Sequence, residues 1–155
     1  MYAKLGERYG EDAHYLVLDG EVTEKVLEVM WSEIFEKFKS NPEQIFILII
    51  TSPGGEFVAT YNFYMKVRFW GIKLVTVAVG TVFSASALLF LAGYERLALR
   101  GALFLFHNSQ SHIENGSLDE EDHVRLATHL HTSQVAQKQL LEDVLKLNGR
   151  DIEKL

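Results

Sequence analysis

Residues 45–55 read IFILIITSPGG, a run of six apolar residues followed by a polar turn that ends in two glycines. A short, continuous apolar run of this kind is typical of a strand that is buried in a parallel sheet. Glycine reaches backbone angles that are closed to other residues, and its amide can come close to a ligand. The stretch therefore predicts a buried strand that leads into a tight turn at Gly54 and Gly55.

Two later segments place chemical groups at the ends of expected strands. A β-branched run leads to Ser84, which opens an apolar helical stretch over 84–92. A serine at such a turn lies at a helix N-terminus, where the local field favours developing negative charge. The run 102–106 ends at His107, which could serve as a general base for Ser84. Together with the amides of the glycine turn, which suit an oxyanion hole, these residues supply the parts of a serine hydrolase.

Each of these signals also has a simpler explanation. Pro-Gly-Gly often forms only a turn, a serine before a helix is commonly an N-cap, and a histidine at a strand end is commonly structural. Taken singly, the residues leave a structural role open. Their joint order along the chain carries the functional prediction.

This joint order resembles the ClpP family, the proteolytic subunit of the caseinolytic serine protease, within the wider ClpP/crotonase superfamily. The resemblance runs from around His14 to Leu155. It implies an α/β fold of the ClpP/crotonase type, built from repeated β-β-α units with a mainly parallel sheet and a long projecting handle helix. The motifs that carry it are Ser52-Pro53-Gly54-Gly55, Gly80-x-x-x-Ser84, the stretch 87–93, Arg96 and the strand that ends at His107.

The resemblance also implies a role for each site residue. Ser84 would be the nucleophile and His107 the base, while the backbone N–H groups of Gly55 and Ala85 would form the oxyanion hole. Ser86 could be taken for the nucleophile, but the family register favours Ser84. The family usually has Met-Gly after the nucleophile where this chain has Ala85 and Ser86, and an alanine amide donates as well as any other.

Two further departures from the family lie near and beyond the histidine. Asn108-Ser109 stands where the family often has Gln-Pro, which changes the segment expected to lie beside the substrate. The aspartate that orients the histidine would fall about three residues beyond Leu155, so we expect the part of the family domain that carries it to be missing from this sequence. Asp151 is predicted to be a helix N-cap rather than its replacement.

Composition fits one soluble globular domain, predicted to cover residues 1–155. The chain is 48% hydrophobic and 23% charged, and it contains no cysteine, which excludes a disulfide framework and a thiol nucleophile. A net charge of −6 without a basic cluster argues against nucleic acid as a partner. The N-terminus lacks the apolar core of a signal peptide, and the apolar stretch 85–93 is too short to cross a membrane. Cytoplasmic residence is the expectation.

Strands and helices are expected to alternate through a head at about residues 14–112. The further elements are strands at 14–20, 74–79 and 95–99 and helices at 23–38 and 58–69. Such alternation predicts parallel strands with right-handed crossovers. A capping-box pattern at 117–120 opens a long helix that is predicted to end near 147. The resemblance makes this helix the handle, and a surface helix packed on its own sheet is the alternative.

These observations predict a serine endopeptidase subunit that cleaves unfolded proteins or peptides, without a metal or an organic cofactor. The peptide would bind in an extended form beside the strand that follows Gly55 and the segment near His107. The resemblance implies homo-oligomeric rings and, in many members, an ATP-dependent unfoldase as a partner. A non-catalytic ring subunit, a crotonase-type acyl-CoA enzyme and a purely structural or binding module are the alternatives.

Overall fold

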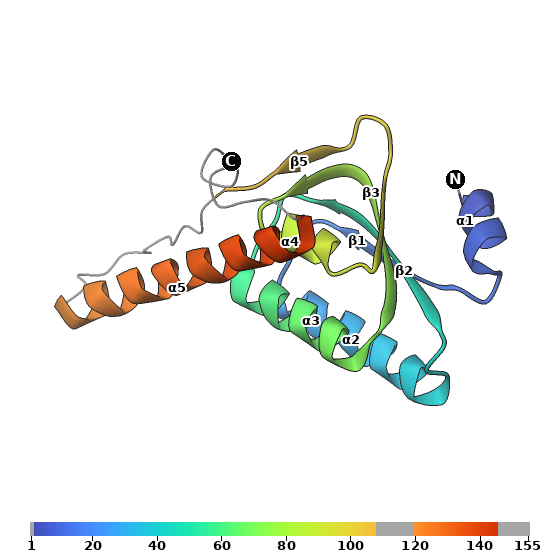
Figure 1. The fold of residues 1–155 in the computed structure, drawn as a ribbon, viewed down its shortest axis with the longest axis horizontal. Coiled ribbons are helices and arrows are strands. Elements are labelled where there is room, and N and C mark those ends of the chain that lie inside the picture. The colour runs from blue at the N-terminus through green and yellow to red at the C-terminus, as the bar shows by residue number, and fades with distance from the viewer. Residues whose placement is uncertain (1, 108–119, 146–155) are drawn as a thin grey trace. The chain divides into compact units, whose positions relative to one another are not determined.

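The computed structural model describes residues 2–107 and 120–145. These residues belong to two compact parts, 1–105 and 106–155, and each part is described by itself. The first part holds a sheet, three helices on one face of it and a short N-terminal helix on the other (Figure 1). Its elements are α1 (Tyr2–Tyr9), β1 (His14–Asp19), α2 (Glu24–Ser40), β2 (Ile45–Ser52), α3 (Phe57–Trp70), β3 (Lys73–Phe83), α4 (Ala85–Leu91), β4 (Glu95–Ala98) and β5 (Leu103–Leu105).

The sheet has the order β1-β2-β3-β4, with β5 paired to β3, and every one of these pairings is parallel. Ala78 of β3 pairs with both β2 and β4, whereas Val82 of β3 pairs with both β2 and β5. β4 and β5 therefore occupy successive stretches of the same edge of β3. The mainly parallel α/β sheet expected from the sequence is confirmed.

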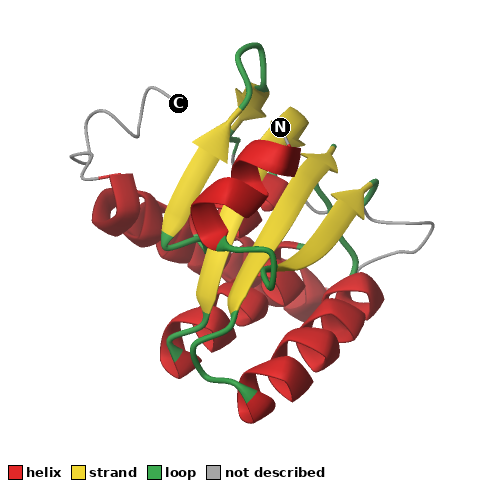
Figure 2. Cartoon of the chain, turned by 90° about the vertical axis from the view of Figure 1, so that its right-hand side faces the viewer, coloured by secondary structure: helices red, strands yellow, loops and turns green. Residues whose placement is uncertain are grey.

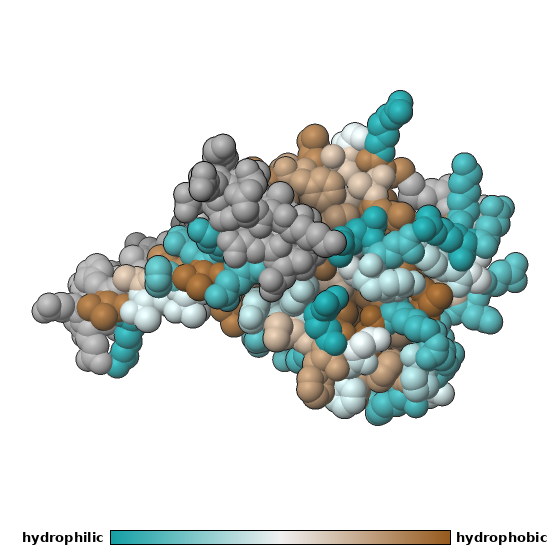
Figure 3. Space-filling view, viewed as in Figure 1, coloured by the Kyte–Doolittle hydropathy of each residue, from teal (hydrophilic) through white to brown (hydrophobic). Residues whose placement is uncertain are grey.

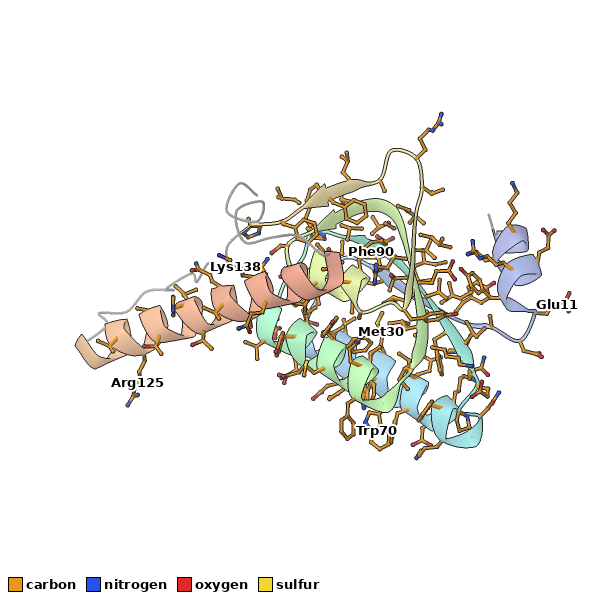
Figure 4. All side chains as sticks on the ribbon, viewed as in Figure 1. Glu11, Met30, Trp70, Phe90, Arg125 and Lys138 are labelled. Carbon is orange, nitrogen blue, oxygen red and sulfur yellow. The ribbon has the colours of Figure 1, made fainter. Side chains whose placement is uncertain are left out.

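The main core lies between the sheet and helices α2, α3 and α4. Alternate residues of the strands point to this side and are almost fully buried. In Figure 4, Met30 points from α2 toward the sheet, whereas Trp70 lies on the outer side of α3 and is 45% exposed. Core residues of this layer include Leu16, Leu18, Leu27, Ile34, Phe46, Leu48, Ile50, Leu74 and Ala78.

The opposite face of the sheet is covered in part by α1, which the sequence did not predict (Figure 2). Leu5 of α1 is 5% exposed and packs in a cluster with Ile47, Val75 and Val77. Arg8 forms an ion pair with Glu95 of β4. A helix of eight residues with a glycine inside it has little stability alone, so these tertiary contacts stabilise α1.

β3 continues past the expected end at residue 79 and reaches Phe83. Between the pairs Ile50–Ala78 and Ser52–Val82, the register advances two residues on β2 and four on β3, which marks a bulge. Gly80 lies in this bulge, where a Cβ would come within 3.0 Å of the Thr51 side chain. The glycine thus permits a close strand approach instead of ending the strand.

The expected helices of the first part are confirmed with small changes at their ends. Thr23 caps α2, and its hydroxyl accepts a hydrogen bond of 3.3 Å from the Val26 N–H. α3 ends at Gly71, which adopts a left-handed conformation at φ 63.

In the second part, α5 (Glu120–Leu145) confirms a long helix of 26 residues. The capping box at 117–120 falls largely outside the described residues, as does the expected end near 147. The projection of this helix as a handle, and the single domain over 1–155, stay predictions.

Candidate active site

Ser84 has an unusual backbone conformation at the point where β3 meets α4. Its φ of 55 and ψ of −125 make it the one non-glycine residue with positive φ in the described part of the chain. Glycine is favoured in this region, and a non-glycine residue there costs about 1–3 kcal/mol. Such strain concentrates at functional sites, and in α/β-hydrolases a sharp strand-to-helix turn exposes the nucleophilic serine.

The surrounding backbone holds Ser84 in this conformation. Its N–H donates to the carbonyl of Leu105 in β5 over 2.7 Å, and its carbonyl accepts from the Ala87 N–H over 2.9 Å. Ser84 occupies the N-cap position of α4 but makes no side-chain capping bond, so the simpler explanation as a capping serine does not hold. The Ser84 hydroxyl is partly exposed and has no hydrogen-bond partner within residues 2–105, so it is available to a substrate.

The glycine turn lies directly against this serine. Gly54 has φ 106, and a Cβ there would come within 2.7 Å of both the Phe83 carbonyl oxygen and the Ser84 Cβ. The same point lies 3.3 Å from the Ala85 nitrogen. The structure therefore brings together the Pro-Gly-Gly turn and the serine turn, which lie 30 residues apart in the sequence.

Val22, which the sequence analysis did not single out, holds the glycine turn in place. The Val22 N–H donates to the Gly54 carbonyl over 2.7 Å, and the Glu56 N–H donates to the Val22 carbonyl over 2.9 Å. A side chain at Gly55, which has φ 148, would come within 2.0 Å of the Val22 oxygen. An apolar residue between a strand and a helix gives no sequence signal for this backbone role.

The backbone N–H groups of Gly55 and Ala85 have no hydrogen-bond acceptor within residues 2–105. The Ala85 N–H belongs to the first residue of α4, so no intrahelical acceptor is available to it. Two uncommitted amides on the turns that flank a partly exposed serine are compatible with an oxyanion hole.

Ser86 is fully buried, in contrast to Ser84. Its Oγ lies 2.7 Å from the Phe83 carbonyl oxygen and 3.2 Å from the Ser52 carbonyl oxygen. A hydroxyl that is buried and bonded in this way is unavailable to a substrate, which supports the choice of Ser84 over Ser86.

His107 belongs to the second part of the chain and is partly buried. Its carbonyl accepts a hydrogen bond of 3.3 Å from the Gln137 side chain of α5. The pairing of His107 with Ser84 stays a prediction. Asn108, Ser109 and Asp151 lie outside the described residues.

The described residues offer no group of three or more histidine, aspartate or glutamate side chains that could hold a metal ion. Over the same ranges, no helix combines the length and the apolar character that a membrane span needs.

Comparisons with known proteins agree on one family. The model of the Clp protease family matches residues 10–152. The chain is 27% identical over 116 residues to the ATP-dependent Clp protease proteolytic subunit 2 of Treponema pallidum, an alignment that covers 74% of this chain and 58% of that protein. It is 28% identical over 144 residues to the protein of the same name from Borreliella burgdorferi, covering 90% of this chain and 69% of that protein. The chain thus spans less than two thirds of the first relative.

Proposed function

This chain belongs to the Clp protease family, and from that membership we propose that it is a serine endopeptidase subunit that cleaves unfolded proteins or peptides. The observation that carries the proposal is the strained backbone of Ser84. Glycine would fill this position without strain, yet the chain has a serine whose hydroxyl is uncommitted within residues 2–105. A role for Ser84 as the nucleophile would explain why the chain keeps a serine in this strained conformation.

The oxyanion hole would consist of the Gly55 and Ala85 amides. Donors of this kind act on the oxygen that gains negative charge when the carbonyl becomes tetrahedral, and they must already be aimed at it. Their freedom from other acceptors within residues 2–105 supports this role. The Val22 clamp and the contact of Gly54 with Ser84 limit how far either amide can move.

His107 is the proposed base, and chain connectivity supports this choice. The Leu105 carbonyl is bonded to the Ser84 N–H, and His107 follows Leu105 by two positions. Two residues span at most about 7 Å, so the Cα of His107 must lie within that distance of the Cα of Leu105. This constraint holds whatever the placement of the second part.

The proposed reaction proceeds in two halves. Ser84 Oγ attacks the scissile carbonyl carbon while His107 takes the hydroxyl proton, and the Gly55 and Ala85 amides bind the oxyanion. His107 then gives its proton to the leaving amine, and the C–N bond breaks to leave an ester on Ser84. Water, deprotonated by the same histidine, hydrolyses this ester and restores the serine.

The substrate would bind as an extended strand. β5 pairs with β3 along one edge, and no other strand pairs with β5 in the described parts of the chain. Leu103, Phe104 and Leu105 are 59%, 39% and 47% exposed, and tan and brown residues lie together at the top of the view in Figure 3, where Figure 1 shows β5. An unpaired edge with apolar neighbours supports binding of a peptide backbone by strand addition.

The proposed partners are further copies of the chain in a ring and a separate ATP-dependent unfoldase, with the complex in the cytoplasm. The names of both relatives include the words ATP-dependent and proteolytic subunit. This sequence contains no phosphate-binding loop motif, so in the proposed complex the partner would bind and hydrolyse ATP. Phe69, 81% exposed, and Trp70 provide apolar surface that a subunit contact could cover.

Labelling with a fluorophosphonate, followed by peptide mapping, tests the proposal. We expect an adduct on Ser84, no adduct in Ser84→Ala, and loss of peptide cleavage in the same variant. A folded protein that takes up no label would refute the peptidase and leave a non-catalytic ring subunit. If Ser84→Ala retained turnover of an acyl-CoA ester, a crotonase-type enzyme would be the better assignment.

A further inference from the structure

One buried hydroxyl joins the two segments that carry the proposed oxyanion donors. Ser86 Oγ lies within hydrogen-bond distance of the carbonyl oxygens of Phe83 and Ser52, at 2.7 and 3.2 Å. Phe83 directly precedes Ser84, whereas Ser52 begins the Ser-Pro-Gly-Gly turn. The hydroxyl therefore connects Ser86, in the first turn of α4, to Ser52, which lies 34 positions earlier in the chain.

The connection continues from Ser52 into the glycine turn. Ser52 is fully buried, and its own Oγ accepts a hydrogen bond of 3.1 Å from the Gly54 N–H. A hydroxyl has one hydrogen, so Ser86 shares it between the carbonyls of Phe83 and Ser52. Ser86 itself is also fully buried, so solvent cannot readily replace its hydroxyl.

Resting on the proposed function, we propose that Ser86 is a positioning residue that sets the spacing between the Gly55 and Ala85 amides. Oxyanion donors act only within about 2.7–3.1 Å of the charged oxygen, so a small relative shift of the two turns weakens one of them. The oxyanion forms in the transition state. Loss of the Ser86 hydroxyl therefore lowers kcat and leaves substrate binding largely unchanged.

The test compares Ser86→Ala with Thr76→Val. Thr76 is also fully buried, and its hydroxyl donates to the Phe90 carbonyl over 2.7 Å at the far end of α4. Both substitutions remove a buried hydroxyl bonded to a backbone carbonyl, but only Ser86→Ala removes a side-chain hydrogen bond between the serine turn and the strand that leads into the glycine turn.

We expect Ser86→Ala to lower kcat and the rate of fluorophosphonate labelling about 10- to 100-fold, because misplacing a group by about 1 Å can cost 100-fold. KM should stay within about twofold of the wild-type value, as is typical when a transition-state interaction is lost. Thr76→Val should retain rates within about twofold of the wild type after correction for the folded fraction. Equal rates in the two variants would overturn the role of Ser86.

Hydrogen exchange over residues 54–56 gives a readout that does not depend on activity. Exchange in this segment should accelerate about tenfold in Ser86→Ala and remain unchanged in Thr76→Val, because only the first variant releases the turn. Unchanged exchange in both variants would overturn the inference. If the wild type fails to label but exchange responds as expected, the link stands and the proposed peptidase function falls.

Discussion

Replacing Gly54 by alanine perturbs the contact between the glycine turn and Ser84 directly. The new Cβ would lie 2.7 Å from the Phe83 carbonyl oxygen and from the Ser84 Cβ, closer than such atoms approach in proteins. A φ of 106 adds backbone strain of about 1–3 kcal/mol for alanine. Overpacking against backbone atoms costs about another 1–3 kcal/mol, so the free energy of unfolding should fall by about 2–6 kcal/mol.

Gly20→Ala is the matched control for this prediction. Gly20 also has positive φ, at 126, but a Cβ there would meet nothing within 4 Å, so only the strain of about 1–3 kcal/mol applies. Urea denaturation of both variants isolates the steric cost, and fluorophosphonate labelling reports the displacement of Ser84. If Gly54→Ala were no less stable than Gly20→Ala and labelled at the wild-type rate, the described packing of the turn against Ser84 would be wrong.

Three further predictions concern Ser84 and the N-terminal helix. The free energy of unfolding of Ser84→Gly should exceed that of Ser84→Ala by about 1 kcal/mol in urea denaturation, because glycine relieves the strain at φ 55. Burial, together with the carboxylate of Glu95, raises the pKa of Tyr9 from its ordinary value near 10 to about 12, so stability present below pH 10 should be lost as the pH rises toward 12. Tyr9→Phe should flatten this loss and remove the latest step from the tyrosinate absorbance titration; an unchanged titration would contradict the assignment. Leu5→Ala should lower the free energy of unfolding by about 2 kcal/mol and accelerate hydrogen exchange over residues 2–9. Unchanged exchange would show that α1 does not depend on the packing of Leu5 against the sheet.

Most elements of the first part could be predicted from local pattern. The continuous apolar run at 45–50 and the capped amphipathic helix at 24–40 carry their own signals, and the structure confirms both. α1 could not be predicted, because Leu5 gains its stability from a sheet face formed by distant residues. The extension of β3 past Gly80 was missed because glycine usually interrupts a strand, and the bulge arises only from pairing with β2.

The candidate site was predictable to a different degree. The order of the motifs identified Ser84, Gly55 and Ala85, and their roles remain predictions drawn from the family resemblance. The clamp by Val22 is made by its backbone N–H and carbonyl. Because these groups do not depend on the side chain, the sequence gives no sign of this role. The two contacts of Ser86 depend on how β2 and β3 end beside each other, which local sequence does not encode.

The bulge at Gly80 divides β3 into one segment that belongs to the core and one that lies next to Ser84. The segment before it lies in the core, where Val75 and Val77 pack against α1 and Thr76 bonds to α4. The segment after it pairs with β5 next to Ser84. A bulge accommodates a change of register locally, so a small shift of the first segment need not reach the second. Substitutions in the core segment of β3 should therefore change the stability of the chain more than the geometry around Ser84. That geometry depends on the residues after the bulge.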